Sequence, residues 1–265
     1  MTSNAEFYDA FASKYEDYYA DIDAQETVRQ WLHYLECQEL VDPYNSRLSS
    51  PPVLLDLGCG PGWHLRPWQR ASFSVCGLDS SPNMLRLAAK NAKAGNLTNI
   101  PLYCASITRP KNLTVLSKKF DIIVGHFNLL NLFSPEQISS LFDAIVLILK
   151  EGGIFVTDTM SQYQFFQQNK NNQHQDFCGW VREVQSWTAS SVSVVWKRSN
   201  MTYIETFWNH HKDWLSQQSE SKNMPLIHSC GWHPYTPNSA WRDSASAMQY
   251  LHVFRKTRER SRNIS

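Results

Sequence analysis

Residues 53–65, VLLDLGCGPGWHL, join a short apolar run to three glycines at alternating positions. An apolar run of this length is typical of a buried strand, and the glycines after it form a turn against which a ligand can lie without meeting a Cβ atom. A helix that begins after the turn offers free backbone N–H groups to an anion. The segment therefore predicts a strand, a ligand-binding turn and a helix in succession.

The spacing of these glycines separates the common nucleotide-binding turns. A dinucleotide-binding turn has the pattern G-x-G-x-x-G, and here Trp63 stands where the third glycine would pack the helix onto the strand. A Walker phosphate-binding loop ends in Gly-Lys-Ser/Thr, which does not follow here. The pattern excludes a Walker loop and disfavours a nicotinamide dinucleotide.

After this turn the chain alternates between predicted strands and helices. Ser81 and Pro82 indicate the start of a helix over residues 82–94, and Ser134 and Gln137 form a capping box for a later helix. Strands are predicted in FSVCGLD (73–79), IPLYCAS (100–106), FDIIVGHF (120–127) and GIFVTD (153–158). We therefore expect an α/β fold with a doubly wound, mostly parallel sheet.

Ligands of such sheets bind at the carboxyl ends of the strands. This rule predicts one contiguous rim made of residues 56–63, 79–81, 104–108, 126–131 and 158–163.

Two amphipathic helices are predicted before the sheet, over residues 4–22 and 25–40, and the first has a face rich in tyrosines. We expect residues 1–45 to form a helical cap and residues 46–265 to form the main domain. Within that domain, residues 163–235 are expected to form a substrate-side insertion or lid.

The predicted insertion has a composition of its own. It begins with a Gln/Asn-rich stretch and contains a predicted hairpin whose turn lies at Ser199 and Asn200. Its many tryptophans either line a pocket for an apolar or planar substrate or simply fill the core. A final strand is predicted within residues 248–257.

The composition indicates a small-molecule partner. The 25 Lys and Arg residues and the 24 Asp and Glu residues give a net charge of +1, so no overall field attracts nucleic acid or an anionic membrane. The N-terminus lacks the pattern of a secretory signal, and the longest uncharged apolar stretch, residues 122–135, is too short and too polar to span a bilayer. We expect a cytoplasmic protein with free buried thiols and no metal site, since the 6 cysteines form no CxxC pair.

VLLDLGCGPGWHL resembles the first signature of the class I S-adenosylmethionine-dependent methyltransferases. VCGLDSSPNMLRLAAKNA (75–92) is similar to their second strand and following helix, FDIIVGHFNLLNLF (120–133) to their fourth strand, and LKEGGIFVTD (149–158) to their fifth. The resemblance covers residues 53–160 and is to the members that act on small molecules. It implies a Rossmann-like, seven-stranded methyltransferase fold with an N-terminal helical cap and antiparallel C-terminal strands.

The resemblance also implies roles for individual residues. Asp79 would bind the ribose hydroxyls of S-adenosylmethionine, and Asp56 its ammonium group, directly or through water. Met84 would pack on the adenine, whereas Ser106 stands where many members have an aspartate that binds the adenine. The full set expected to contact S-adenosylmethionine, or its product S-adenosylhomocysteine, is Tyr8, Asp56, Gly58, Cys59, Gly60, Gly62, Asp79, Ser80, Met84, Ser106, Ile107, His126 and Phe127.

His126 and Tyr15 are the candidate catalytic residues. His126 lies on the predicted rim, where it binds the cofactor carboxylate, acts as a base or serves only as a structural histidine. The opening EFYDAFASKYEDYY (6–19) resembles the N-terminal helix of small-molecule methyltransferases, which implies that Tyr8 or Tyr15 reaches the methionine carboxylate or the substrate. The alternative is that these tyrosines belong to a packing stripe. The implied activity is methyl transfer to a nitrogen or oxygen of a small molecule by in-line displacement. A nicotinamide-dependent oxidoreductase and a non-catalytic cofactor-binding protein remain the alternatives.

Overall fold

The computed structural model describes most of the chain. The described residues are 4–19, 22–42, 50–97, 100–107, 113, 116, 119–162, 164–165, 174–177, 179–232 and 247–257.

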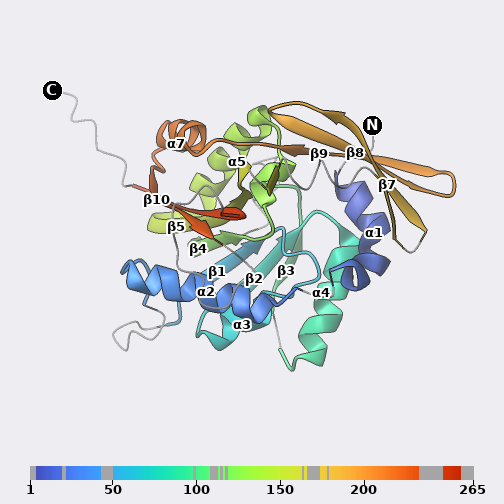
Figure 1. Ribbon diagram of the computed structural model, residues 1–265. Helices are drawn as coiled ribbons and strands as arrows, with labels where there is room; N and C mark the ends of the chain where they lie inside the picture. Colours follow the sequence, from blue (N-terminus) through green and yellow to red (C-terminus); the bar gives the residue numbers. More distant parts are fainter. Residues whose placement is uncertain are drawn as a thin grey trace.

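A seven-stranded sheet forms the centre of the molecule (Figure 1). Its order is β10-β11-β5-β4-β1-β2-β3; β11 runs antiparallel to both β10 and β5, and the other neighbouring strands are parallel. This arrangement confirms the predicted fold class. The strands are β1 (Val53–Leu57), β2 (Ser74–Asp79), β3 (Leu102–Cys104), β4 (Phe120–Gly125), β5 (Leu149–Met160), β10 (Leu226–Trp232) and β11 (Gln249–Arg255).

Helices cover both faces of this sheet because alternate strand residues point to opposite sides. Leu54 belongs to the apolar cluster that contains α2 (Ala24–Cys37) and α3 (Leu65–Arg70), whereas Leu55 belongs to the cluster that contains α5 (Pro135–Ile148). Figure 1 shows these helices on opposite sides of the sheet. Two apolar layers therefore hold the strand ends, and the turns that follow them, in fixed positions.

Local capping sets the helix boundaries. The Ser81 side chain accepts a hydrogen bond from the Met84 backbone at the start of α4 (Pro82–Ala94), which matches the predicted helix in both bounds. Ser134 and Gln137 form the predicted capping box of α5. The short 3-10 helix η2 (Leu129–Leu132) lies between β4 and α5, and α7 (Lys212–Glu220) precedes β10.

A second, antiparallel sheet has the order β6-β7-β8-β9. Its strands are β6 (His174–Phe177), β7 (Trp180–Trp187), β8 (Ser191–Arg198) and β9 (Met201–Trp208). The hairpin turn at Ser199 and Asn200 is confirmed, whereas β6 and β7 were not predicted. The predicted insertion extends too far, because β10 lies in the main sheet and supplies its edge strand.

The first helix, α1 (Asn4–Tyr18), packs on this second sheet. The Phe7 ring lies 5.3 Å from the Trp196 ring and the Phe11 ring lies 5.7 Å from the Trp180 ring, measured between centroids. At β9, the last strand of this sheet, the Trp208 carbonyl accepts a hydrogen bond of 2.6 Å from the Asn131 side chain of η2. The second sheet is thus fastened both to α1 and to the loop that follows β4.

The described residues show how exposed the cysteines are and how long and apolar the helices are. Cys59 and Cys76 are buried free thiols as predicted. Cys37, the last residue of α2, and Cys104, the last residue of the edge strand β3, are exposed, and Cys230 is half-buried; Cys178 lies outside the described residues. No helix in the described part of the chain has both the length and the apolar character needed to cross a membrane.

Candidate active site

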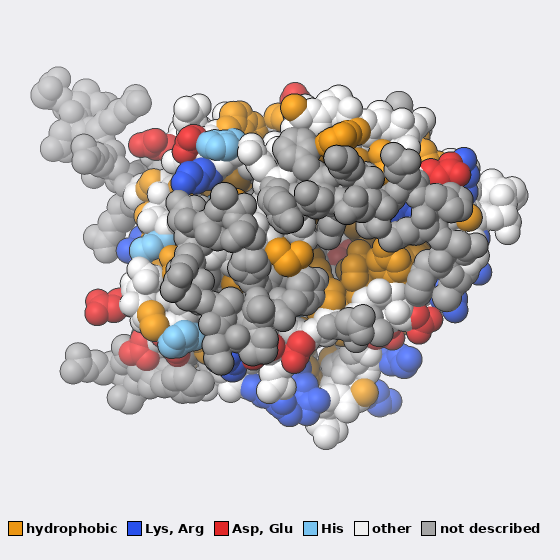
Figure 2. Space-filling model, viewed as in Figure 1, with side chains coloured by type: hydrophobic (Ala, Val, Ile, Leu, Met, Phe, Trp, Pro, Cys, Tyr) orange, Lys and Arg blue, Asp and Glu red, His pale blue; other side chains and the backbone are white. Residues whose placement is uncertain are grey.

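A cavity of about 350 Å³ opens at the carboxyl ends of β1, β2 and β4 and is also lined by α1 and β7–β9. Hydrophobic side chains gather on the corresponding side of the molecule, beside α1 and the second sheet (Figure 2). All but Asp56 and Gly62 of the predicted site residues line this one cavity. Those lining it are Tyr8, Tyr15, Gly58, Cys59, Gly60, Asp79, Ser80, Met84, Ser106, Ile107, His126 and Phe127.

The glycine turn forms the floor of the cavity. Gly58 and Gly60 have φ values of +71° and +50°, in the left-handed region that side chains other than glycine's disfavour. A Cβ atom on Gly58 would lie 2.8 Å from Leu129, whereas one on Gly60 would point into open space. Gly62 has a different task, because its Cβ would lie 3.0 Å from the Ala88 side chain of α4. Gly62 therefore permits close helix packing, and Gly60 presents bare backbone to the cavity.

Asp79 ties the glycine turn to the start of α4. One carboxylate oxygen accepts the Gly60 backbone N–H at 2.9 Å, and the other accepts the Ser81 backbone N–H at 2.8 Å. Burial raises the pKa of this carboxyl, and the backbone hydrogen bonds oppose that rise. A carboxylate has about four acceptor positions, so the backbone donors leave room for a hydroxyl group in the cavity.

His126 lies in a stack of buried rings. Its ring centroid is 3.9 Å from that of His64 and 4.1 Å from that of Trp31, and the Trp68 indole N–H donates a hydrogen bond of 3.1 Å to its Nε2 atom. Because Nε2 accepts this hydrogen bond, the proton of the neutral ring is on Nδ1, which is buried and has no hydrogen-bond partner among the described residues. Burial and His64 hold the pKa of His126 well below its usual value. The geometry favours a neutral hydrogen-bond donor over a general base.

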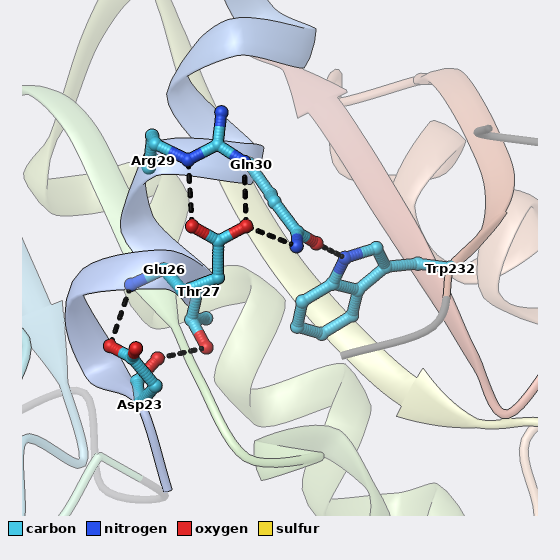
Figure 3. A network of polar contacts seen from close by, with 6 residues as sticks. All are labelled: Asp23, Glu26, Thr27, Arg29, Gln30 and Trp232. Atoms are coloured by element: carbon cyan, nitrogen blue, oxygen red, sulfur yellow. Dashed lines mark hydrogen bonds and ion pairs between the residues drawn. The ribbon is translucent and has the colours of Figure 1, made fainter. Parts of the chain in front are cut away.

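The helix that supplies Trp31 is fixed by a polar network at its N-terminal half (Figure 3). Asp23 caps α2 by accepting the Glu26 backbone N–H at 2.9 Å. The Gln30 side chain then accepts a hydrogen bond of 2.6 Å from the Trp232 indole of β10. This network holds α2 against the sheet and so keeps Trp31 against His126.

Residues 54–153 match a family model described as a methyltransferase domain. The match contains the glycine turn, Asp79 and His126, which are the parts of the cavity described above. Residues 54–153 therefore form a methyltransferase domain, and the chain has the fold of the class I S-adenosylmethionine-dependent methyltransferases. S-adenosylmethionine is its cofactor, as the sequence predicts.

Individual relatives agree with this assignment. A methyltransferase of Geobacillus sp. (strain WCH70), whose name gives its activity as inferred, is 30% identical over 112 residues, which are 42% of this chain and 43% of that protein. The ubiquinone biosynthesis O-methyltransferase of Pelagibacter ubique (strain HTCC1062) is 30% identical over 140 residues, which are 49% of this chain and 52% of that protein. The chain therefore spans about half the length of the curated relatives it matches.

A solved structure matches over nearly the whole chain. An S-adenosylmethionine-dependent methyltransferase from Clostridium acetobutylicum ATCC 824 aligns with a TM-score of 0.73 and 19% identity, covering 95% of this chain and 100% of that chain. The two proteins share a fold, including the elements outside the methyltransferase domain.

The residues of the methyltransferase domain fit the cofactor. Asp56 is 1% exposed, and its Oδ2 atom is buried beside the glycine turn with no partner among the described residues. Burial and the charge of Asp79 raise the pKa of this carboxyl to about 8. An ammonium group, or a water molecule that carries its hydrogen bond, would satisfy this oxygen. The bare backbone at Gly60 leaves room for the chain that bears that ammonium group.

The first helix, α1, contacts the start of α4 and the residue that follows the glycine turn. The Asp9 side chain accepts hydrogen bonds of 2.8 Å from the Ser81 hydroxyl and from the backbone and side chain of Asn83. The centroid of the Tyr15 ring lies 5.5 Å from that of Trp63, which follows the glycine turn. The contacts join α1 to both ends of the cofactor-binding segment.

The far side of the cavity contains a buried carboxylate that the sequence analysis missed. Glu205 accepts hydrogen bonds from the Tyr8 hydroxyl at 2.7 Å and from the Trp196 indole at 3.1 Å. The signal was present in TYIETFW, because the period of two places Glu205 on the same strand face as Tyr203 and Phe207. A charged residue between aromatic residues on an inward face is a candidate functional residue.

Asp158 at the end of β5 is a second missed carboxylate. It lines the cavity, and its Oδ1 atom accepts the Asn128 backbone N–H at 2.7 Å. Burial raises its pKa to about 7, so this carboxyl exchanges protons near neutral pH. Its position on the rim at residues 158–163 was predicted, but no role was assigned to it.

Proposed function

We propose that this protein transfers a methyl group from S-adenosylmethionine to a nitrogen or oxygen atom of a small molecule by in-line displacement. The observation that carries the proposal is a single cavity that joins the glycine turn and Asp79 to Glu205 and Asp158. One end of this cavity suits the cofactor, and the other suits a second molecule.

The cofactor end is formed by the predicted residues. We assign Asp79 to the ribose hydroxyls, Asp56 to the ammonium group, and Met84, Ser106 and Ile107 to the surroundings of the adenine. Ser106 donates or accepts through its hydroxyl in place of the aspartate that related enzymes often have. When bound, S-adenosylmethionine supplies a methyl group that is activated by a positively charged sulfur.

The chain's own contribution is orientation and the exclusion of water. In-line displacement needs no covalent intermediate, so alignment of the acceptor with the methyl group is the main requirement. Tyr15, Tyr19, Trp63 and Phe127 close a ring of aromatic side chains above the turn, with neighbouring centroids 4.7–6.4 Å apart. This ring keeps the reacting atoms away from solvent.

Two predicted catalytic residues act as hydrogen-bond donors in this proposal. His126 offers its Nδ1 proton to the cofactor carboxylate or to the acceptor. Burial and the charges of Asp79 and Glu205 raise the pKa of Tyr15, so its phenol stays protonated. Asp158 or Glu205, whose pKa values are both raised by burial, can take a proton from the acceptor.

We propose the predicted division of the chain into a cap of residues 1–45 and a main domain of residues 46–265, with the predicted lid of residues 163–235 shortened to the part that precedes β10. The Pelagibacter ubique relative is named as an O-methyltransferase, so the panel of candidate acceptors includes oxygen as well as nitrogen nucleophiles. A non-catalytic cofactor-binding protein would have no reason to keep Glu205 and Asp158 in an open cavity, and the balanced net charge argues against nucleic acid as substrate.

Calorimetry with S-adenosylhomocysteine tests the cofactor half of the proposal. Incubation with S-adenosylmethionine and a panel of amines, phenols, alcohols and carboxylic acids, followed by mass spectrometry, tests the acceptor half. Binding without any methylated product from the panel would favour the non-catalytic alternative. A failure to bind would contradict the proposal altogether.

A further inference from the structure

We propose that the methyl acceptor is a small-molecule amine, which enters the cavity as an ammonium ion and is held by Glu205 among aromatic rings. This inference rests on the proposed methyl transfer and specifies its substrate class.

The burial of Glu205 is the first observation. Along β9, Glu205 is the one side chain that is fully buried, at 2% exposure, while its strand neighbours are half-buried or exposed. Burying a carboxylate costs free energy unless donors compensate it. Tyr8 and Trp196 fill one acceptor position on each oxygen, which leaves a further position on each for a donor in the cavity. Glu205 lines the cavity, so a ligand bound there can donate hydrogen bonds to these free acceptor positions.

Among the described residues, Arg182 is the positively charged side chain that acts on Glu205. Arg182 on β7 lines the same cavity with its Cζ atom 6.0 Å from the centre of the Trp196 ring. Its charge, together with the hydrogen bonds from Tyr8 and Trp196, opposes the rise in the Glu205 pKa that burial causes. Arg182 therefore helps Glu205 to exist as an anion, which is the form that attracts an ammonium ion.

Aromatic side chains are the second observation. Those of Tyr8, Tyr15, Tyr18, Trp196 and Phe207 line the cavity near Glu205. The Tyr8 and Tyr15 rings are 6.2 Å apart, and the Tyr18 and Trp196 rings are 6.0 Å apart. Ring faces attract alkylammonium ions, and added methyl groups keep the positive charge while increasing apolar contact. Such walls accept both the substrate and its methylated product.

The balance of donors and acceptors is the third observation. Among the described residues that line the cavity, the carboxylates are Asp23, Asp79, Asp158 and Glu205, against the single guanidinium of Arg182. Of the lining atoms that are buried without a partner, those of Asn128, Gln164 and Gln249 are amide oxygens, and the others are ring nitrogens of His64 and His126. Oxygen acceptors and negative charge favour a ligand rich in donors, and an ammonium group has three N–H bonds. A carboxylate acceptor would meet like charges.

The chemical step balances without another reagent. The ammonium ion gives one proton to the Glu205 carboxylate, which becomes a carboxylic acid, and the free amine keeps its lone pair. The nitrogen lone pair then forms the bond to the methyl carbon while the carbon–sulfur bond breaks and its electrons stay on sulfur. The positive charge moves from sulfur to the methylated nitrogen. Burial raises the pKa of Glu205, which makes it a better proton acceptor.

The test uses matched probes on the full-length protein. 2-Phenylethylamine, tyramine, cyclohexylamine and 1,4-diaminobutane are compared with the alcohols of the same carbon skeletons. Binding of each probe to the protein saturated with S-adenosylhomocysteine is measured by thermal shift and calorimetry, and methylated product with S-adenosylmethionine is measured by mass spectrometry. We expect amines to bind at least about tenfold more tightly than the paired alcohols, and product to form on nitrogen.

The variant Glu205→Gln should weaken amine binding about tenfold to a hundredfold and leave the affinity for S-adenosylhomocysteine within about twofold. Glu183→Gln is the matched control, since Glu183 lies on the same sheet, forms an exposed ion pair with Lys197 and does not line the cavity. Should Glu205→Gln fail to fold, the amine-to-alcohol ratio of the wild-type protein still decides the question.

Three results would overturn the inference. They are product from alcohols alone, equal binding of amines and alcohols, and binding of S-adenosylhomocysteine with no response to any amine. None of these by itself contradicts the proposed methyl transfer, which is tested separately by the binding of S-adenosylhomocysteine and by product formation across the wider panel of acceptors.

Discussion

Cofactor binding should release a proton from Asp56, and this release can be measured. The Asp56 carboxyl is buried, its Oδ2 atom has no partner in the part of the chain that the structure describes, and burial together with Asp79 raises its pKa to about 8. At pH 7 a carboxyl with that pKa is about nine-tenths protonated. The ammonium group of the ligand favours the ionised form, and a positive charge this close lowers a carboxyl pKa by roughly 1–3 units. Binding at pH 7 should therefore release about 0.8–0.9 protons per site if the shift reaches two units or more.

The sign of the pH dependence follows from the same argument. Ionised Asp56 binds the ammonium group, and the protonated form must first lose its proton. The affinity for S-adenosylhomocysteine should therefore rise about fivefold to sevenfold per pH unit between about pH 6 and pH 8 and level off once the pH exceeds the pKa of about 8.

Isothermal titration at pH 7 in phosphate and in Tris measures the release, because the two buffers differ strongly in ionisation enthalpy. Asp56→Asn should remove the difference between buffers. Asp158→Asn, which changes another buried carboxyl with a raised pKa of about 7, is the matched control and should retain most of it. Equal heats in both buffers for the wild-type protein, or an unchanged difference in Asp56→Asn, would refute the reasoning.

Three other changes test the construction of the site. Asp79→Asn should weaken S-adenosylhomocysteine binding by about 1.5–3 kcal/mol in calorimetry, because it removes a charged acceptor, and an unchanged affinity would remove Asp79 from the ribose site. Asp9→Ala should speed the dissociation of S-adenosylhomocysteine in stopped-flow measurements by loosening α1 from Ser81, whereas Asp17→Ala, on an exposed part of α1 at 62% side-chain exposure, should not. Gly62→Ala should lower the unfolding free energy in urea by about 2–3 kcal/mol, since strain at positive φ adds to the close contact with α4; loss of less than about 1 kcal/mol would contradict that contact.

The cofactor half of the cavity was predictable from sequence because short-range rules determine it. Alternating strands and helices predicted the order of β1, β2 and β4, and the caps at Ser81 and Ser134 predicted where two helices begin. The glycines and Asp79 then fall at strand ends, and the ends of parallel strands meet at one edge. Gly62 is the exception among these glycines, because it permits close packing of α4. The glycine spacing alone does not reveal that role.

The acceptor half depends on contacts between distant parts of the chain. The hydrogen bond between Tyr8 and Glu205 joins residues that are 197 positions apart. The period of two places Glu205 on an inward face of its strand, but no local pattern says that α1 and the cavity lie against that face. The strands β6 and β7 were missed for a related reason, since WVREVQSW mixes charged and aromatic residues and is stabilised by its partners in the sheet.

Two neighbouring residues of α1 connect the two halves of the cavity. Tyr8 donates to Glu205 on the acceptor side, and Asp9 accepts from Ser81, whose backbone N–H in turn binds Asp79 on the cofactor side. A ligand that stabilises the Asp79 turn therefore also stabilises the position of α1, and so the position of Tyr8 against Glu205. By linkage, the cofactor should increase the affinity for the acceptor, and the acceptor should increase the affinity for the cofactor by the same factor. Because the ring formed by Tyr15, Tyr19, Trp63 and Phe127 depends on the same helix, the step that orders the acceptor also excludes water. The tyrosine-rich helix thus has a use beyond packing, because it makes the closed site depend on both molecules.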